Sequence, residues 1–493
     1  IVDLNLKLEN QNIEFKSGID LLVENIIFSD IKNTAWLNKL LWKVNLSNPE
    51  VKFQDYLFSC SKIVSDRKAE SLSFKSIKVN TTNNISRGLE IRKAGIHNIN
   101  ITGIKYNTIF NKGTPVIASI SIEKPYADIS IDNRLQKTTA KTGNKQKSIT
   151  IPIDLDEFVI VDLSLNAEHR DSSSIAEIKL NDLDMRFHKS GSDNIFDWLD
   201  YLQITDFIYS DAVKDYYLSM QQLNIDGKKQ NIRFKNIKGG NIDSVSAGKN
   251  RMEYTSSGLD IKGVDISRTI PHDIMIQEVN IEDFDLYTED HKAAKSNSAK
   301  SDIKQIKLPD IINRFEIGIF NGGNININHV AVADSSRKET MLSNVSFLIN
   351  SIKFDSTIVS NRDFQFAEQF SINISENKFI SSDSLYETSF NTINYNFSEN
   401  LFWIDSLTMR PRYASEDFFR KAVYQTGKID LVINRVACHD FRLKKMINSG
   451  NIHFGGVDLT GLAVDIYRNK KYDMNPDAYV KMPQEAILGM DRI

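Results

Sequence analysis

Hydrophobic and polar residues alternate with a period of two along most of the chain, as in AEIKLNDLDMRF (176–187) and NININHVAV (324–332). In an extended chain this period places successive side chains on opposite faces, and it predicts a mostly β protein. Helical spacing is confined to three short stretches, 34–42, 194–202 and 415–422. Asp193 and Ser415 are candidate N-caps of the second and third of these helices.

A short phrase recurs four times, as GIDLLVENIIF (18–28), HNINITGIKY (97–106), GLDIKGVDI (258–266) and IDLVINRVAC (429–438). Each copy alternates, skips one residue at Asn25, Gly103, Gly263 or Arg435, and then resumes on the opposite parity. One extra residue that keeps apolar side chains on one face is what a β-bulge adds to a strand. The predicted inward positions are Leu21, Val23, Ile26, Phe28, Ile99, Ile101, Ile104, Tyr106, Leu259, Ile261, Val264, Ile266, Leu431, Ile433, Val436 and Cys438.

A second strand follows each copy, and its parity also shifts midway. The shifts fall at Asn48-Pro49, Lys124-Pro125, Asp283-Phe284 and Gly461-Leu462. Proline in two of them fits a bulge or an edge, because proline cannot donate to a regular ladder. The inward positions of these strands are Val44, Leu46, Val51, Phe53, Ile120, Ile122, Ala127, Ile129, Val279, Ile281, Leu286, Val457, Leu459, Val464 and Ile466.

A longer period contains the phrase. The stretch from Ile149 resembles the stretch from Ile306, with Pro152 over Pro309 and Phe158 over Phe315. The expected fold is an elongated, tandem-repeat antiparallel sheet with few short helices. We predict a partial first repeat at 1–132, a second repeat at 149–288 and a third repeat at 306–471. Residues 472–493 are the start of a further unit or a C-terminal extension. Polar loops at 133–148 and 289–305 separate the three repeats.

Such a sheet must cover its apolar face, and the chain offers no long amphipathic helix to do so. The sheet folds into a sandwich, closes as a barrel, or curls into a taco-like trough that holds an apolar ligand. Repeated bulges on one face favour steady curling into a trough. An open apolar trough is a binding surface, since large bare apolar patches are rare.

The net charge is -3, with 61 basic and 64 acidic residues, so composition gives no reason to expect nucleic acid. Two cysteines, Cys60 and Cys438, exclude a disulfide scaffold and a cysteine zinc module; both are expected to be small buried hydrophobes. No apolar run is long enough for a membrane-spanning helix. Because the chain starts inside a strand pattern, we expect a fragment or processed form.

Catalytic and metal-binding motifs are absent from the sequence. The eight histidines are scattered, and no HExxH, GxSxG, P-loop or dinucleotide fingerprint occurs. Carboxylates such as Asp260, Asp265, Glu278 and Asp283 sit at outward positions, where solvated strand faces explain them. We therefore expect neither enzyme activity, nor a cofactor, nor a metal.

The repeated phrases, above all NRFEIGIFNGGNININHVAV (313–332) and the copies of GLDIKGVDIS…VNIEDFDLY, resemble the AsmA-like superfamily of bacterial envelope proteins, which includes TamB and YhdP. Asparagine, lysine and isoleucine usage suits a Bacteroidota-type member. The resemblance implies a periplasmic protein tethered to the inner membrane by an N-terminal helix that this chain lacks. It also implies a β-groove whose apolar positions conduct phospholipid toward the outer membrane, with a possible outer-membrane or periplasmic protein partner.

Two other classes stay open. A structural or scaffolding protein of an envelope or surface complex would have a closed, packed core and no bound lipid. A carbohydrate-active or adhesive protein would need aromatic platforms on the outward face. The four tryptophans of this chain, Trp36, Trp42, Trp198 and Trp403, show no repeated outward register, so this class ranks last.

Overall fold

The fold is that of a computed structural model, in which the chain divides into two compact units, Ile1–Val245 and Ser246–Ile493. The division falls inside the predicted repeat 149–288. The structure describes residues 2–10, 13–24, 41–53, 56–81, 89–110, 114–132, 153–171, 173–191, 194–242, 250–267, 272–291, 312–333, 336–355, 369–374, 378–381, 383–443, 446 and 452–473.

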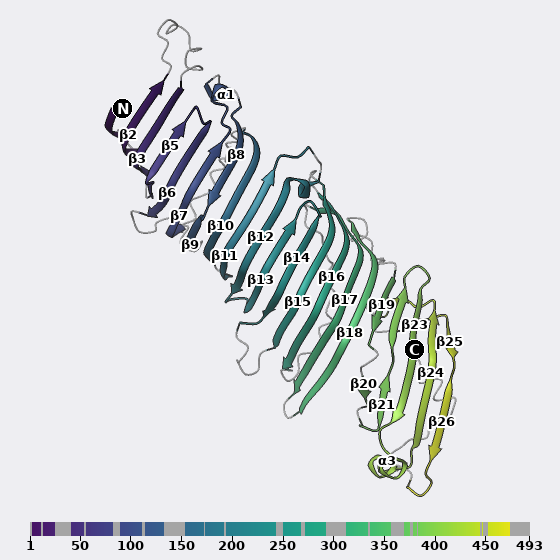
Figure 1. Ribbon diagram of the computed structural model, residues 1–493. Coiled ribbons are helices and arrows are strands. Elements are labelled where there is room, and N and C mark those ends of the chain that lie inside the picture. Colours follow the sequence, from purple (N-terminus) through teal and green to yellow (C-terminus); the bar gives the residue numbers. More distant parts are fainter. Residues whose placement is uncertain are drawn as a thin grey trace, which may run out of the picture. The chain divides into compact units, whose positions relative to one another are not determined.

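The N-terminal unit is a single layer of strands that pair mostly with their neighbours in the chain (Figure 1). Two strand positions are interrupted: β4 and β5 both pair with β3 and β6, and β8 and β9 both pair with β7 and β10. Its strands are β1 (Val2–Asn10), β2 (Ile13–Glu24), β3 (Leu41–Phe53), β4 (Tyr56–Ser59), β5 (Lys62–Asp66), β6 (Ser71–Thr81), β7 (Leu89–Thr102), β8 (Val116–Glu123), β9 (Tyr126–Asp132), β10 (Asp154–Arg170), β11 (Ile175–His188), β12 (Leu199–Asp211), β13 (Tyr216–Asp226) and β14 (Asn231–Gly240).

The C-terminal unit is built in the same way. Here β21 and β22 share the partner β23, and β25 and β26 share the partner β24. Its strands are β15 (Arg251–Ile266), β16 (His272–His291), β17 (Ile312–Ala333), β18 (Ser336–Asp355), β19 (Gln369–Asn373), β20 (Lys378–Ile380), β21 (Tyr386–Ser389), β22 (Thr392–Asn396), β23 (Leu401–Pro411), β24 (Gly427–His439), β25 (Gly456–Thr460) and β26 (Ala463–Arg468).

The prediction of a mostly β fold is confirmed, but the prediction of a purely antiparallel sheet is wrong. β10 runs parallel to β8 and β9, and β17 runs parallel to β16. A parallel pair needs a connection long enough to return along the strand, whereas a short hairpin gives only an antiparallel pair. The polar segments 133–148 and 289–305 stand at these two connections. Residues 133–148 and 292–305 lie outside the described residues, whereas Glu289, Asp290 and His291 belong to β16 and not to the predicted loop.

In nearly every strand the alternation of inward and outward residues is interrupted once. The interruptions of neighbouring strands lie beside one another, so together they form a line across the sheet. At this place two residues instead of one separate consecutive inward apolar positions, for example Asp405-Ser406 on β23 and Asn434-Arg435 on β24. In the N-terminal unit the line of irregularities crosses from β3 to β14, and in the C-terminal unit from β15 to β25 and β26. We call this feature the bend line of each unit.

Residues with a left-handed backbone mark the bend line. All four parity shifts predicted on the second strands fall on it, at Asn48 (φ 48°), Lys124 (φ 50°), Asp283 (φ 42°) and Gly461 (φ 65°). Further left-handed positions on the line are Ser76, Asp162, Asp206, Asn236, Asn324, Asn344 and Ser406. Polar residues and glycine adopt this conformation most readily, and bulges increase the local bend and twist of a sheet.

The order of strands repeats along the chain. After the second copy of the phrase (β7 with β8 and β9) come β10 to β14, and after the third copy (β15 with β16) come β17 to β23 in five matching positions. β10 breaks register with β11 at Leu163, as β17 does with β18 at Ile325. When β10 and β17 are aligned at the bend line, Phe158 therefore corresponds to Phe320 and not to Phe315 as predicted. The reason is that β17 has more residues before its bulge than β10 has.

The helices agree with the sequence only in part. The predicted helix 415–422 is confirmed as α3 (Ser415–Ala422), although Ala414 rather than Ser415 is its N-cap. The stretch 194–202 forms only the short 3-10 helix η4 (Ile195–Trp198), capped by Asn194, before β12 begins. In 34–42 the last two residues belong to β3 and the rest lie outside the described residues. An unpredicted helix, α1 (Tyr106–Phe110), follows β7.

Candidate functional site

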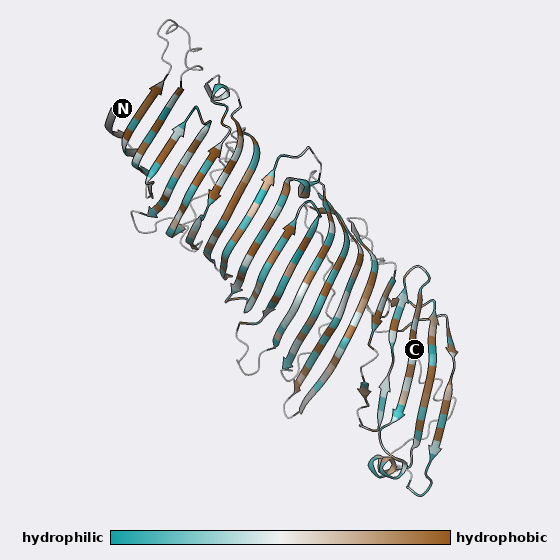
Figure 2. Ribbon diagram, viewed as in Figure 1, coloured by the Kyte–Doolittle hydropathy of each residue, from teal (hydrophilic) through white to brown (hydrophobic). Residues whose placement is uncertain are grey.

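One apolar row crosses the N-terminal unit next to its bend line. Directly paired residues share a face of the sheet, and in this row every pair is apolar on both sides. Figure 2 shows hydrophobic and hydrophilic residues alternating along the strands that contribute to it. The row consists of Ile19, Leu46, Ile63, Phe74, Ile99, Ile122, Ile160, Met185, Leu202, Ile225 and Ile232.

The C-terminal unit has two such rows. The row beside the bend line contains Leu259, Ile281, Gly322, Phe347, Ile372, Ile393, Ile404, Val436 and Leu459. The next row contains Ile261, Val279, Phe320, Ile349, Phe370, Tyr395, Phe402, Cys438 and Val457. Many of the residues predicted from the repeats therefore stand directly side by side.

A cluster in the C-terminal unit shows that apolar residues from both sides of the bend line share one face. Ile325, Val345 and Ile374 are buried at the line itself. Phe347 and Ile372 pack on them from one side of the bend line. Ile327 and Leu342 are among the apolar residues that pack on them from the other side of the line. The bulge thus keeps the apolar side chains together where strict alternation would have moved them to the opposite face.

The predicted lining residues differ in burial. Most of them, including Ile99, Ile101 and Ile122, are half-buried. Those that the protein itself buries are Ile104, Tyr106, Val264, Val279 and Ile433. Those that are exposed are Leu21, Val457, Leu459 and Val464. Ile26 and Phe28 lie outside the described residues.

Two of the buried residues, Ile104 and Val264, lie near one end of their strands. Gly103 and Gly263 have a left-handed backbone, and each is followed by a residue that is at most 4% exposed, Ile104 or Val264. The fourth copy has the same pair of features: Asp440 has a left-handed backbone (φ 52°), and the next residue, Phe441, is 4% exposed. All three left-handed residues stand six positions after the bend line of their strands, so Asp440, not Arg435, is the counterpart of Gly103.

These positions change how two copies of the phrase align. Val436, not Leu431, corresponds to Leu259 in the fourth copy, because both follow the bend line directly. In the first copy Leu21 corresponds to Ile261 rather than to Leu259. Tyr106 is not a strand residue but starts α1, where its ring meets Trp42 edge-on at 5.1 Å.

Part of the apolar face in the C-terminal unit is covered by protein. Phe441 packs over Tyr395 and stacks on Phe402, with ring centroids 4.8 Å apart in the second pair. Cys438 is half-buried beside this cluster, and burial raises the pKa of its thiol. At the other end of the strands Phe418 and Phe419 of α3 are fully buried. No comparable cluster of buried residues occurs along the row Ile19 to Ile232 within the described residues.

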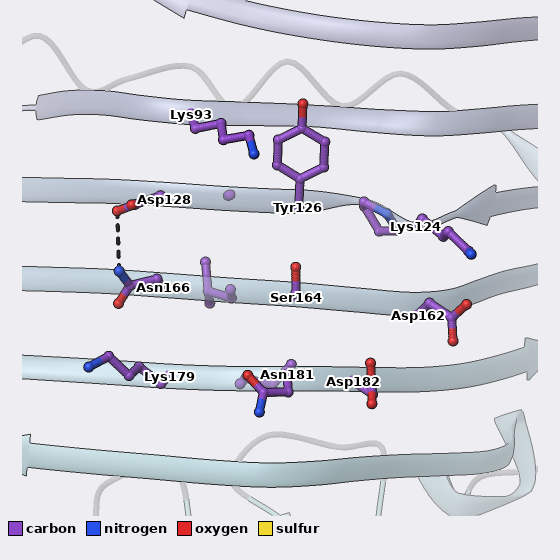
Figure 3. A pocket seen from close by; sticks show the side chains of 14 residues that line it. Lys93, Lys124, Tyr126, Asp128, Asp162, Ser164, Asn166, Lys179, Asn181 and Asp182 are labelled. Carbon is purple, nitrogen blue, oxygen red and sulfur yellow. Dashed lines mark hydrogen bonds between the residues drawn. The ribbon is translucent and has the colours of Figure 1, made fainter.

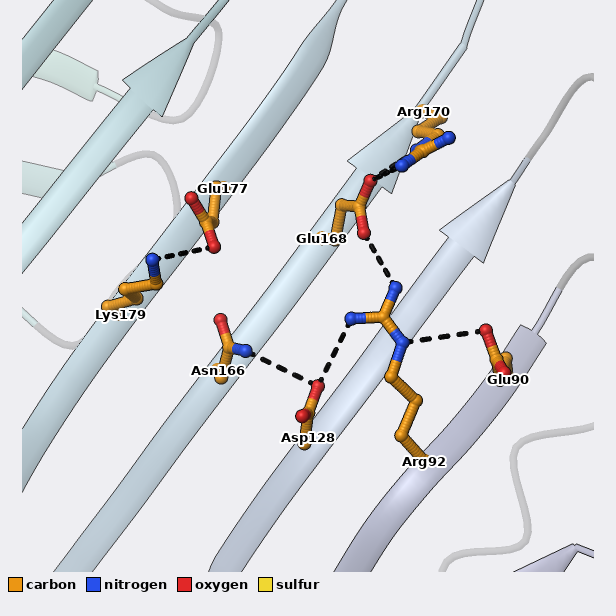
Figure 4. Close-up of polar contacts among 8 residues, drawn as sticks. All are labelled: Glu90, Arg92, Asp128, Asn166, Glu168, Arg170, Glu177 and Lys179. Carbon is orange, nitrogen blue, oxygen red and sulfur yellow. Dashed lines mark hydrogen bonds and ion pairs between the residues drawn. The ribbon is translucent and has the colours of Figure 1, made fainter.

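The outward face is polar and carries ion pairs. Arg92 on β7 links β9 and β10, at 3.5 Å from Asp128 and 2.7 Å from Glu168 (Figure 4). Hydrogen bonds from Arg92 and Arg170 lower the pKa of the Glu168 carboxyl. Asn166 donates to Asp128 across the same parallel junction at 3.4 Å. Of the outward carboxylates predicted on β15 and β16, Glu278 lies 3.1 Å from Lys262, and Asp283 accepts hydrogen bonds from Ser257 and Asn324. The prediction that Asp260 is solvated is wrong, because this residue is buried.

No known family model matches this chain, and no curated protein sequence matches it. Among the described residues no group of three histidine, cysteine, aspartate or glutamate side chains is arranged to hold a metal ion. None of the described helices is long and apolar enough to cross a membrane. Cys60 and Cys438 are free thiols.

Proposed function

We propose that the chain is a non-enzymatic envelope protein that binds phospholipid acyl chains along its apolar rows and conducts them between the inner and outer membrane. The observation that carries the proposal is the row from Ile19 to Ile232. It is apolar on every strand that it crosses, and all its members except Ile160 are only half-buried. A continuous apolar surface of this length needs a covering, and hydrocarbon covers it without any polar partner.

The row also suits movement better than storage. Its members are similar in size and chemistry, so an acyl chain lying along it meets nearly equivalent contacts on successive strands. Neighbouring strands are about 4.8 Å apart, so a shift by one strand exchanges one apolar residue for the next. Many weak and equivalent contacts give a flat energy profile, whereas one deep pocket would hold the lipid in place.

The resemblance of the repeated phrases to AsmA-like proteins supports the same proposal, and with it a periplasmic location and an anchor in the inner membrane. A second candidate is a scaffolding protein with a closed core. The clusters around Phe441 and Phe418 favour it, because there protein covers the apolar face. The two candidates differ in what they expect along the row of the N-terminal unit, where the first expects lipid and the second expects none.

A crosslinking experiment separates them. Ile99 and Asn100 are neighbours on β7 whose side chains lie on opposite faces of the sheet. We expect a photoreactive benzoylphenylalanine in place of Ile99 to form phospholipid adducts in membranes of the producing cell, detected by mass spectrometry of the intact chain. The same residue in place of Asn100 is the matched control. Equal adduct yields at the two positions, or none at Ile99, would contradict the lipid proposal.

A further inference from the structure

Among the described residues, each unit has a cleft on its own outward face at its parallel junction. The first has a volume of about 760 Å³ and lies over β7, β9, β10 and β11 (Figure 3). The second has a volume of about 390 Å³ and lies over β15 to β18. Both volumes fall within the range of about 300–1,000 Å³ that is typical of small-molecule sites. Neither cleft belongs to the apolar rows, which lie on the other face.

In the first cleft a tyrosine stands among polar groups of both signs. The Tyr126 ring lies over Gly95, where an added Cβ would meet its hydroxyl oxygen at 2.7 Å, and Lys93 Nζ lies 5.2 Å from the ring centroid. Next to it, one row of directly paired residues runs across the sheet: Lys93, Asp128, Asn166 and Lys179. Figure 3 shows these side chains on the same side of the ribbon as Tyr126.

The second cleft contains side chains of the same kinds, although here the tyrosine follows the aspartate along the strand. Tyr287 stands on β16 with the Arg251 guanidinium carbon 5.0 Å from its ring centroid. Beside it Asn326 on β17 donates to Asp285 on β16 at 2.7 Å. Asp285 and Asn326 are directly paired across the parallel junction, as Asp128 and Asn166 are in the first cleft; Tyr287 is likewise paired with Asn328.

Each cleft also contains a buried acceptor that lacks a donor. The Oδ1 atom of Asn166 in the first cleft and that of Asn328 in the second are buried without a hydrogen-bond partner. A buried carbonyl oxygen without a donor costs free energy.

The chemistry of the clefts narrows the ligand class. Lysines and aspartates alternate in the first cleft, so a polyanion such as nucleic acid gains no net attraction there. An aromatic ring among carboxylate, amide and ammonium groups offers one flat apolar surface and both donors and acceptors. Sugar rings have one apolar C–H face and a rim of hydroxyl groups that donate and accept.

We propose that the two outward clefts bind neutral oligosaccharide, with Tyr126 and Tyr287 as the aromatic platforms. The sequence offered no repeated outward tryptophan for this role, and the junction tyrosines fill it. Asp128 and Asp285 accept sugar hydroxyls, because Arg92 and Asn166 on the first and Asn326 on the second hold these carboxylates in place. Binding at this face is separate from lipid binding at the apolar rows.

The test is a titration of the full chain with cellotetraose, maltotetraose and chitotetraose, followed by isothermal calorimetry and by saturation-transfer NMR. At least one of the three is expected to bind saturably. The double variant Tyr126→Ala, Tyr287→Ala is expected to bind it roughly tenfold more weakly or not at all. The matched control is Tyr201→Ala, since Tyr201 is an exposed tyrosine on the outward side of β12 beyond both clefts.

Two results would overturn the proposal: no saturable binding of any of the three sugars, or unchanged binding by the double variant. Because Tyr126 packs on Gly95, its loss can disturb the fold, so Asp128→Asn with Asp285→Asn serves as a second variant that keeps both rings. It is expected to weaken binding while the unfolding midpoint stays the same. Lipid adducts at Ile99 report on the other face, so either proposal can fail without the other.

Discussion

Replacing Ile122 by aspartate tests whether the apolar row of the N-terminal unit faces hydrocarbon. Ile122 is directly paired with Ile99 and Ile160, and it is half-buried. Full burial of an isoleucine side chain is worth about 1.5–3 kcal/mol, so the half left uncovered by protein contributes about 1 kcal/mol to lipid binding. A carboxylate against hydrocarbon adds a penalty of at least about 2 kcal/mol. The sum of about 3 kcal/mol corresponds to roughly hundredfold weaker binding at this strand.

The matched control is Ser121→Asp. Ser121 is the preceding residue of β8 and its side chain lies on the opposite face, so the same charge enters the same strand away from the row. Loading is measured with a fluorescent phospholipid in the purified chain, and folding with urea unfolding followed by circular dichroism. Equal loading by Ile122→Asp and wild type would refute the reasoning, and so would equal losses in the two variants. Ile122→Ala, with a smaller loss, replaces Ile122→Asp if the charged variant does not fold.

Three further predictions concern the fold. Phe418→Ala should destabilise the C-terminal unit by about 3–5 kcal/mol, because this ring is fully buried, and hydrogen exchange should show the loss there while lipid loading of the N-terminal unit persists. Gly103→Ala should lower the thermal midpoint, since φ is +64° and the new Cβ would lie 2.4 Å from that of Ala118; Gly323→Ala, with open space at that position, is the neutral control. Asp211 accepts hydrogen bonds that lower its pKa from 3.8 to about 2, and the one from Ser174 has the largest effect. The ionised carboxylate therefore stabilises the fold above pH 4, and this stabilisation is lost as the pH falls toward 2. The difference in thermal midpoint between wild type and Asp211→Asn should shrink over that range.

The parity shifts of the second strands were the part of the fold that the sequence predicted best. An extra residue shifts the parity of every apolar position after it, so Asn48, Lys124, Asp283 and Gly461 could be located from the pattern alone. The bulges predicted in the phrase itself are not found at Gly103, which follows the end of β7, or at Gly263, where the pairing with β16 keeps its register, and Asn25 lies outside the described residues. Pairing was harder to predict, because alternating strands of similar composition match one another at many offsets and in either direction. The parallel junctions at β10 and β17 and the alignment of the fourth copy depend on register, which the pattern does not encode.

The sequence predicted the apolar character of the candidate site better than it predicted which residues of the site are left uncovered by protein. Alternation identified apolar residues such as Ile99 and Ile122, which do stand side by side. It did not distinguish buried residues, such as Val264 and Val279, from half-buried ones, because burial depends on tertiary packing that alternation does not encode. The outward tyrosines of the two clefts were missed as well. Tyr126 occupies an ordinary polar-face position in its strand, and only the parallel pairing brings Asp128 and Asn166 beside it.

The most direct test of lipid binding is organic extraction of the purified chain followed by lipid mass spectrometry, with an unrelated β protein purified in the same detergent as the control. Our account predicts phospholipid in stoichiometric amounts, more than one molecule per chain, lost selectively from Ile122→Asp. Reproducible absence of phospholipid from the folded chain would contradict the account and would favour a scaffold with a closed core.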